Sequence, residues 1–284
     1  LPHKAGNASD MDSALIVKYQ GERLQCVANS SDVSFDDAMI ETCGGRTGEV
    51  EILCCGYTGA GPFPQTYFDL DDPDLPEVAE RKKRQFFERY IKLVEAVGAK
   101  KNLAFAGKYL LGGKLAPMNA FRGVADPVEI IEIDPNAVIL ADNGGSIDTT
   151  SLNPSAVRTQ RYDQEMVAKR ISELADKPMD YERLMDLAEA GQLPIRRLLG
   201  IASKRAFERS ECDIDYFYVI PVGNDQFAVL NINKSNPSIS FANAQSDLPE
   251  PRSLLEIDAR YLFGLLTNIY HWNNAEVGSQ FETR

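Results

Sequence analysis

The first half of the chain alternates between short apolar runs and a long amphipathic stretch. Apolar runs of strand length predict strands at residues 13–19, 23–28, 51–55, 102–106, 128–133 and 137–141. Between residues 74 and 97, aromatic and aliphatic side chains recur at three- and four-residue steps, which predicts a long helix ended by Gly98. Strands that interleave with helices are typical of an α/β layer structure. We expect this class for residues 1–145.

The second half has a different pattern. Residues 146–162 are polar and read as a linker. Helical periodicity then covers residues 164–175, 181–189 and 195–209, and antiparallel strands follow at residues 216–222, 226–232 and near Ile239. Asp258 is placed to cap a helix that reaches residue 268, before a loop with Trp272 and a last strand. A segment in which helices come first and strands follow predicts a separate, smaller α+β domain over residues 163–284.

A glycine-rich loop follows the strand predicted at residues 51–55. Residues 56–64 contain three glycines and two prolines, a composition that sets backbone geometry instead of filling a core. Loops at strand ends commonly carry function. The alternative is an ordinary strand-to-helix connection, and composition alone does not separate the two interpretations.

Composition narrows the class of protein. The 284 residues are 44% hydrophobic and 25% charged, which is typical of a globular protein with a sizeable core. A net charge of −12 argues against a general nucleic-acid binder, and the basic run at residues 81–84 is better explained as a solvated helix face. No apolar run is long enough to span a membrane and no signal peptide is evident, so we expect a cytoplasmic protein.

The chain has five cysteines: Cys26, Cys43, Cys54, Cys55 and Cys212. Their number is odd and their spacing is not that of a metal site. Cys54 and Cys55 are adjacent on a predicted strand and must point to opposite faces. We therefore expect reduced, structural thiols.

Three phrases carry a resemblance to a known family. They are residues 1–10 (Leu-Pro-His-Lys-Ala-Gly-Asn-Ala-Ser-Asp), 57–65 (Tyr-Thr-Gly-Ala-Gly-Pro-Phe-Pro-Gln) and 105–109 (Phe-Ala-Gly-Lys-Tyr). With the hairpin that ends near Asp32, they resemble the C-terminal half of a metallo-β-lactamase-fold domain. The nearest branch contains CMP-N-acetylneuraminate hydroxylase, with related folds in ascorbate-6-phosphate lactonase and the phospholipase D that cleaves N-acyl phosphatidylethanolamine. Residues 254–281 are similar to a sterol-carrier-protein-like domain.

The resemblance implies a partial αββα sandwich and a metal centre. The family uses an N-terminal H-x-H-x-D-H motif, a later His, an Asp after a strand and a last His. His3 matches the later His, and Asp32 matches the Asp and is the catalytic candidate. The last His would fall at Ala106 or Gly107 and is absent, as is the H-x-H-x-D-H motif. We expect an N-terminal portion of the same domain, preceding Leu1, to supply the missing ligands; the alternative is a degenerate site.

The metal implied by the resemblance is zinc or iron. A metal-bound water could attack a lactone, amide or phosphoester, whereas iron would allow oxygen chemistry. The residues also have simpler interpretations: His3 as a surface side chain, and Asp32 as the cap of a helix that reaches Thr42. His271 has no partner His or Cys nearby and is expected to be structural.

Substrate contacts are predicted on two loops. Tyr57, Thr58 and Gln65 supply donors and acceptors on the glycine-rich loop, and Lys108 supplies a positive charge. The leading hypothesis is a metal-dependent hydrolase or oxygenase acting on a small carbohydrate or nucleotide-sugar type substrate. The competing hypothesis is a non-catalytic binding or assembly protein with a degenerate metal site. No nucleic-acid or membrane partner is expected, and self-association is left open.

Overall fold

The computed structural model describes residues 14–19, 23–28, 49–105, 107–186, 191–223 and 226–284. The chain forms two compact units, and each is assembled from several stretches. Unit 1 takes its described residues from Leu1–Ala60, Pro76–Leu110 and Gly123–Lys169, whereas unit 2 takes them from Gly61–Leu75, Leu111–Arg122 and Arg170–Arg284. The predicted linker at residues 146–162 lies in unit 1.

The sheet of unit 1 has the strand order β1-β2-β3-β4-β5. Its strands are β1 (Ala14–Tyr19), β2 (Arg23–Ala28), β3 (Ile52–Gly56), β4 (Lys101–Phe105) and β5 (Ala137–Val138). The predicted hairpin is confirmed, because β1 and β2 pair antiparallel. The pairs β2–β3, β3–β4 and β4–β5 are parallel. The expected mixed α/β class is confirmed, and the αββα sandwich stays a prediction.

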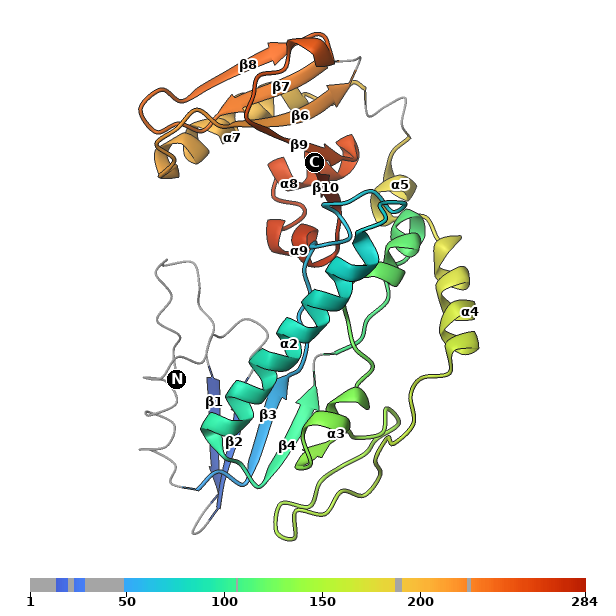
Figure 1. The fold of residues 1–284 in the computed structure, drawn as a ribbon. Coiled ribbons are helices and arrows are strands. Elements are labelled where there is room, and N and C mark those ends of the chain that lie inside the picture. The colour runs from blue at the N-terminus through green and yellow to red at the C-terminus, as the bar shows by residue number, and fades with distance from the viewer. Residues whose placement is uncertain (1–13, 20–22, 29–48, 106, 187–190, 224–225) are drawn as a thin grey trace. The chain divides into compact units, whose positions relative to one another are not determined.

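Helix α2 (Leu75–Val97) connects β3 to β4 and lies across one face of this sheet (Figure 1). Its Tyr90, Leu93 and Val94 are buried in one cluster with Leu53 and Cys55 of β3. These helix residues recur at three- and four-residue steps and so share one stripe of the helix surface. The crossover helix is therefore held to the sheet by the apolar stripe that predicted it.

A strand predicted at residues 128–133 is wrong, because these residues form the short helix α3 (Glu129–Ile133). Asp126 accepts a hydrogen bond from the Val128 backbone N–H, and Glu129 accepts one from the Asp126 backbone N–H. These two bonds fix the chain where it enters the helix, and Pro127 favours the first turn. The Asp-Pro-Val-Glu sequence was thus a helix-start signal that the apolar residues obscured.

Residues beyond β5 fold back along it. Backbone hydrogen bonds join Ala141 N–H to Ala156 O at 3.2 Å and Arg158 N–H to Ile139 O at 2.8 Å. The turn between them begins at Asp142-Asn143-Gly144-Gly145, a composition suited to chain reversal. As a result, Asp142 and Arg158 lie next to each other, although they are sixteen positions apart in the sequence.

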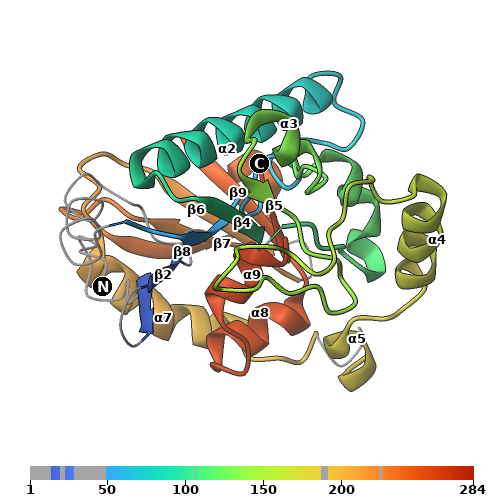
Figure 2. The same cartoon turned by 90° about the horizontal axis from the view of Figure 1, so that it is seen from below.

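The sheet of unit 2 has the strand order β10-β9-β6-β7-β8. These strands are β6 (Phe217–Gly223), β7 (Gln226–Asn231), β8 (Ser238–Ala242), β9 (Arg252–Ile257) and β10 (Phe281–Thr283). The predicted β6–β7 hairpin is confirmed as antiparallel, and β6 pairs parallel with β9. Helix α7 (Ile195–Arg209) packs against β7 and β8 (Figure 2). Its Ile195 and Leu199 share a buried cluster with Ile220 and Leu230.

The remaining helices are α4 (Gln164–Ala175), α5 (Asp180–Leu184), α8 (Ala259–Leu266), α9 (Trp272–Val277), η1 (Gly113–Phe121) and η2 (Gln245–Asp247). Asp258 caps α8 as predicted, because its side chain accepts a hydrogen bond from the Arg260 backbone N–H. His271 is structural, as predicted: it caps α9 by accepting a bond from Asn273 N–H. Trp272 belongs to that helix, and the predicted Trp-containing loop is wrong there.

In the described part of the chain, no helix is long and apolar enough to cross a membrane.

Candidate functional site

Unit 1 contains a cavity of about 270 Å³ at the carboxyl ends of its parallel strands. Ligands of open α/β sheets commonly bind at this edge, because the loops that leave the strands converge there. The strand ends contribute Phe105 from β4 and Ile139 from the segment after β5. The full lining is Tyr57, Leu103, Ala104, Phe105, Gly107, Lys108, Pro127, Ile139, Leu140, Asp142 and Tyr162.

Two predicted substrate contacts, Tyr57 and Lys108, meet at this cavity. Tyr57 directly follows β3 and is 2% exposed, whereas Lys108 follows β4 and is partly exposed. Because β3 and β4 are parallel neighbours, residues just beyond their carboxyl ends lie close together. The backbone N–H of Lys108 donates a hydrogen bond to the Tyr57 hydroxyl.

Gly107 allows this close approach between the two loops. A Cβ atom at residue 107 would lie 1.8 Å from the Tyr57 hydroxyl oxygen and 2.3 Å from Cζ. A side chain here therefore overlaps a buried aromatic ring that has little room to move. Residue 107 is one of the two positions where the resemblance would place a last metal-binding His, and this packing leaves no space for an imidazole.

Burial raises the pKa of Tyr57 well above its ordinary value, and the nearby Asp126 carboxylate adds to the rise. The Lys108 N–H bond opposes the shift, because it favours the charged phenolate. The Tyr57 side chain is therefore a neutral phenol at physiological pH. Since its oxygen already accepts the Lys108 N–H, its own proton is suited to donation.

Tyr162 forms the aromatic wall of the cavity, and Asp142 holds it in place. The Tyr162 hydroxyl donates to the Asp142 carboxylate, with distances of 3.1 and 3.2 Å to its two oxygens. Arg158 forms an ion pair with the same carboxylate, and its guanidinium lies 4.1 Å from the Tyr162 ring centroid. Burial and the bond to Asp142 raise the pKa of Tyr162. The ring is thus oriented by a charged pair beside it.

Sequence reasoning missed Asp142 and Tyr162 as site residues. Both belong to the stretch that the polar composition marked as a connection. The available signal was the Asn-Gly-Gly turn after an apolar run, which indicates that the chain reverses and returns to the strand ends. Pairing of Arg158 with Ile139 then brings Tyr162 to the cavity.

The other two predicted contacts lie elsewhere. Thr58 is 1% exposed in unit 1 and does not line its cavity. Gln65 belongs to unit 2 and is 1% exposed. Its side-chain amide donates to Gly61 O at 2.7 Å and to Ser279 Oγ at 2.9 Å. Gln65 therefore braces the glycine-rich loop against Ser279 within unit 2.

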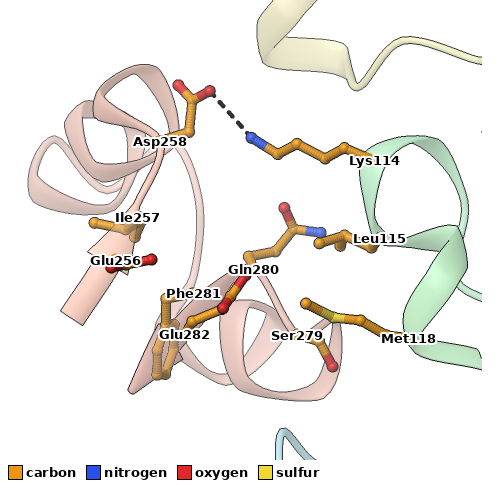
Figure 3. Close-up of a pocket in the computed structure, with 10 residues that line it drawn as sticks. All are labelled: Lys114, Leu115, Met118, Glu256, Ile257, Asp258, Ser279, Gln280, Phe281 and Glu282. Atoms are coloured by element: carbon orange, nitrogen blue, oxygen red, sulfur yellow. Dashed lines mark hydrogen bonds and ion pairs between the residues drawn. The ribbon is translucent and has the colours of Figure 1, made fainter. Parts of the chain in front are cut away.

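Unit 2 has a cavity of its own, of about 330 Å³, lined by Lys114, Leu115, Met118, Glu256, Ile257, Asp258, Ser279, Gln280, Phe281 and Glu282. Figure 3 shows the Lys114 side chain reaching toward Asp258, with the Gln280 amide below this ion pair. The acidic groups have cationic partners: Asp258 pairs with Lys114 and Arg260, while Arg284 contacts both Glu256 and Glu282.

Burial and repulsion from Glu256 raise the pKa of Glu282, which lies directly opposite Glu256 across the β9–β10 pair. Like charges in this position destabilise a sheet, and Arg284 offsets the repulsion. The charges around the cavity of unit 2 are thus balanced within the unit, which distinguishes it from the cavity of unit 1.

The predicted metal ligands His3 and Asp32 lie outside the described residues. Within the part that the structure describes, no group of three or more His, Cys, Asp or Glu side chains is arranged to hold a metal ion. Cys54, Cys55 and Cys212 are not part of disulfide bonds, and Cys55 is buried while Cys54 is partly exposed. Burial raises the pKa of the Cys54 thiol, which favours its unreactive form.

Comparison with known proteins gives no match to this chain among protein-family models, curated proteins or solved structures. A function must therefore be inferred from the side chains of the site.

Proposed function

We propose that the chain is the substrate-binding part of a metal-dependent hydrolase or oxygenase, acting on a small carbohydrate or nucleotide-sugar type molecule. The observation that carries this proposal is the cavity of unit 1, where Tyr57 and Lys108 meet at the carboxyl ends of β3 and β4. The sequence alone also predicts both residues as substrate contacts.

The cavity offers the mixture of groups that a polar small molecule needs. Tyr57 provides a neutral hydroxyl donor, Lys108 a cation and Tyr162 an aromatic face. The remaining wall is largely apolar and excludes water from part of the ligand. A sugar ring with hydroxyl groups on its edge and C–H groups on its face matches this combination.

The metal part of the proposal depends on His3 and Asp32, together with ligands from an N-terminal portion of the same domain. A bound zinc or iron ion would polarise an acceptor oxygen and activate water, or with iron support oxygen chemistry. The described residues of unit 1 would bind and orient the substrate, and the neutral Tyr57 would hold its proton for donation.

Elemental analysis of the intact protein tests the metal dependence. After expression in medium supplemented with iron and zinc, we expect a stoichiometric amount of one of these metals, and His3→Ala and Asp32→Ala variants should lose it. The matched control is His271→Ala, because this His caps a helix and should leave metal content unchanged. Absence of stoichiometric metal in the wild-type protein would contradict the enzyme proposal.

A further inference from the structure

Within the described parts of the chain, the Lys108 ammonium forms no ion pair with a carboxylate. Among the residues that the structure describes, its interaction is with the face of Tyr162, 5.8 Å from the ring centroid. The side chain is partly buried and lines the cavity of unit 1. Partial burial of an unpaired charge costs free energy, and a cation–π contact repays only part of it. An anionic group in the cavity would offset the rest.

The other charges at the cavity do not compete for such a group. Asp142 is the acidic residue of the lining, and its carboxylate is already engaged by Arg158 and by the Tyr162 hydroxyl. The Asp126 carboxylate, which lies near both tyrosines, accepts hydrogen bonds from the Val128 and Tyr162 backbone N–H groups. Lys108 is therefore the cation of this lining, and its sign is opposite to the net charge of −12 of the whole chain. Charges more than about 8 Å apart are largely screened at physiological ionic strength, so a ligand in the cavity is affected more by Lys108 than by the net charge of the chain.

From these contacts we infer that the cavity of unit 1 selects an anionic ligand and holds its carboxylate or phosphate group at Lys108. The Tyr57 hydroxyl lines the same cavity and is suited to donate to a neighbouring oxygen of the ligand. Tyr162, fixed by Asp142, offers its ring to the uncharged remainder of the molecule. This inference depends on the proposed function and makes it more specific: the substrate is anionic, and Lys108 binds its anionic group.

Calorimetric titration of the intact protein tests the inference with four probes. CMP-N-acetylneuraminate carries both kinds of anionic group, N-acetylneuraminate carries a carboxylate, CMP carries a phosphate, and N-acetylmannosamine is uncharged. The wild-type protein should bind CMP-N-acetylneuraminate and at least one of the two single-anion probes more tightly than the uncharged sugar. The single-anion probe that binds more tightly identifies which group Lys108 holds.

Lys108→Met should weaken binding of that anionic probe by about 10- to 100-fold, as expected for loss of one charge-assisted hydrogen bond. Lys108→Arg should retain most of the affinity, because it keeps the charge. The matched control is Lys92→Met on the exposed surface of α2, which changes net charge equally and should have no effect.

Equal affinity of wild type and Lys108→Met for the anionic probes would overturn the inference, as would preference for the uncharged sugar or failure of every anionic probe to bind. These outcomes are separate from the metal measurement, so the inference can fail while a stoichiometric metal still supports the proposed enzyme class.

Discussion

Replacement of Asp134 with alanine is expected to lower the free energy of unfolding of unit 1 by about 3–5 kcal/mol, because two buried donors each lose a charged acceptor. The Asp134 side chain is 4% exposed and accepts hydrogen bonds from the Tyr90 hydroxyl and the Asn102 amide, each at 2.8 Å. It also accepts the Asn136 backbone N–H at 2.9 Å. Removing the carboxylate leaves the buried Tyr90 and Asn102 donors unpaired, and each lost partner carries a desolvation penalty.

This network joins the elements that carry the candidate site. Tyr90 lies on α2, Asn102 on β4, and Asp134 at the end of α3. Burial and the bond to Asp134 contribute to raising the pKa of Tyr90, which keeps it a neutral donor. Loosening the network would shift β4 against its neighbours and disturb the loop that holds Lys108.

Urea unfolding read by chemical labelling of Cys55 measures this effect locally, because Cys55 is buried in the core of unit 1. Fragmentation of the labelled peptide by tandem mass spectrometry distinguishes Cys55 from the adjacent Cys54. Asp71→Ala, at an exposed position of unit 2, is the control and should change stability by less than about 0.5 kcal/mol. A loss below about 1 kcal/mol for Asp134→Ala would show that the buried carboxylate is dispensable.

In unit 2, Asp258→Asn is expected to lower stability at pH 7 by about 2–4 kcal/mol. Asp258 pairs with Arg260 at 2.8 Å and with Lys114 at 3.2 Å, and its side chain is 9% exposed. Although burial opposes ionisation, the bonds to Arg260 and the Lys114 charge lower the pKa of Asp258 to about 2. Asparagine keeps the oxygen that caps α8 but replaces the second carboxylate oxygen, which accepts from Arg260 and Lys114, with a neutral NH2 group. The substitution therefore removes the ion pairs while it keeps the cap.

The pH dependence follows from the direction of that shift. Because the folded-state pKa lies below the ordinary value of 3.8, the stabilisation is fully present above pH 3.8 and is lost as the pH falls through about 2. The wild-type and Asp258→Asn proteins should therefore differ at pH 7 and converge near pH 2. Trp272 is the single tryptophan of the chain and lies in unit 2, so its fluorescence reports this unit. A difference that persists unchanged to pH 2 would contradict the ionic origin.

The positions of the long helices could be predicted from the sequence, because each of these helices has a long apolar stripe. The helices predicted at residues 164–175 and 195–209 coincide with α4 and α7, and the helix predicted to end at Val97 does end there. Each has a three- or four-residue repeat over several turns, which a strand cannot reproduce. The strand predicted at residues 128–133 is wrong for the opposite reason. Helix α3 has five residues, too few to show a helical period, and hydrogen bonds at Asp126 favour the helix.

The candidate site was predictable only in part. Tyr57 and Lys108 could be chosen because each follows an apolar strand and a glycine lies beside the second, and a parallel pair of strands brings them together. Tyr162 could not be chosen, because its place depends on the backbone pairing of Arg158 with Ile139 and on the bond to Asp142. Closeness in the sequence did not predict the position of Gln65. It follows Tyr57 by eight residues but belongs to the other unit.

The central claim is that the cavity at the strand ends of unit 1 is where the ligand binds. Hydrogen–deuterium exchange of the intact protein, with and without saturating CMP-N-acetylneuraminate, tests it at the level of segments. We expect slower exchange in the ligand-bound protein at residues 103–108, 139–142 and 158–162, which carry the lining and the Lys108 and Arg158 amides. Unchanged exchange in these segments, or slowing confined to residues 279–282 of unit 2, would contradict the claim.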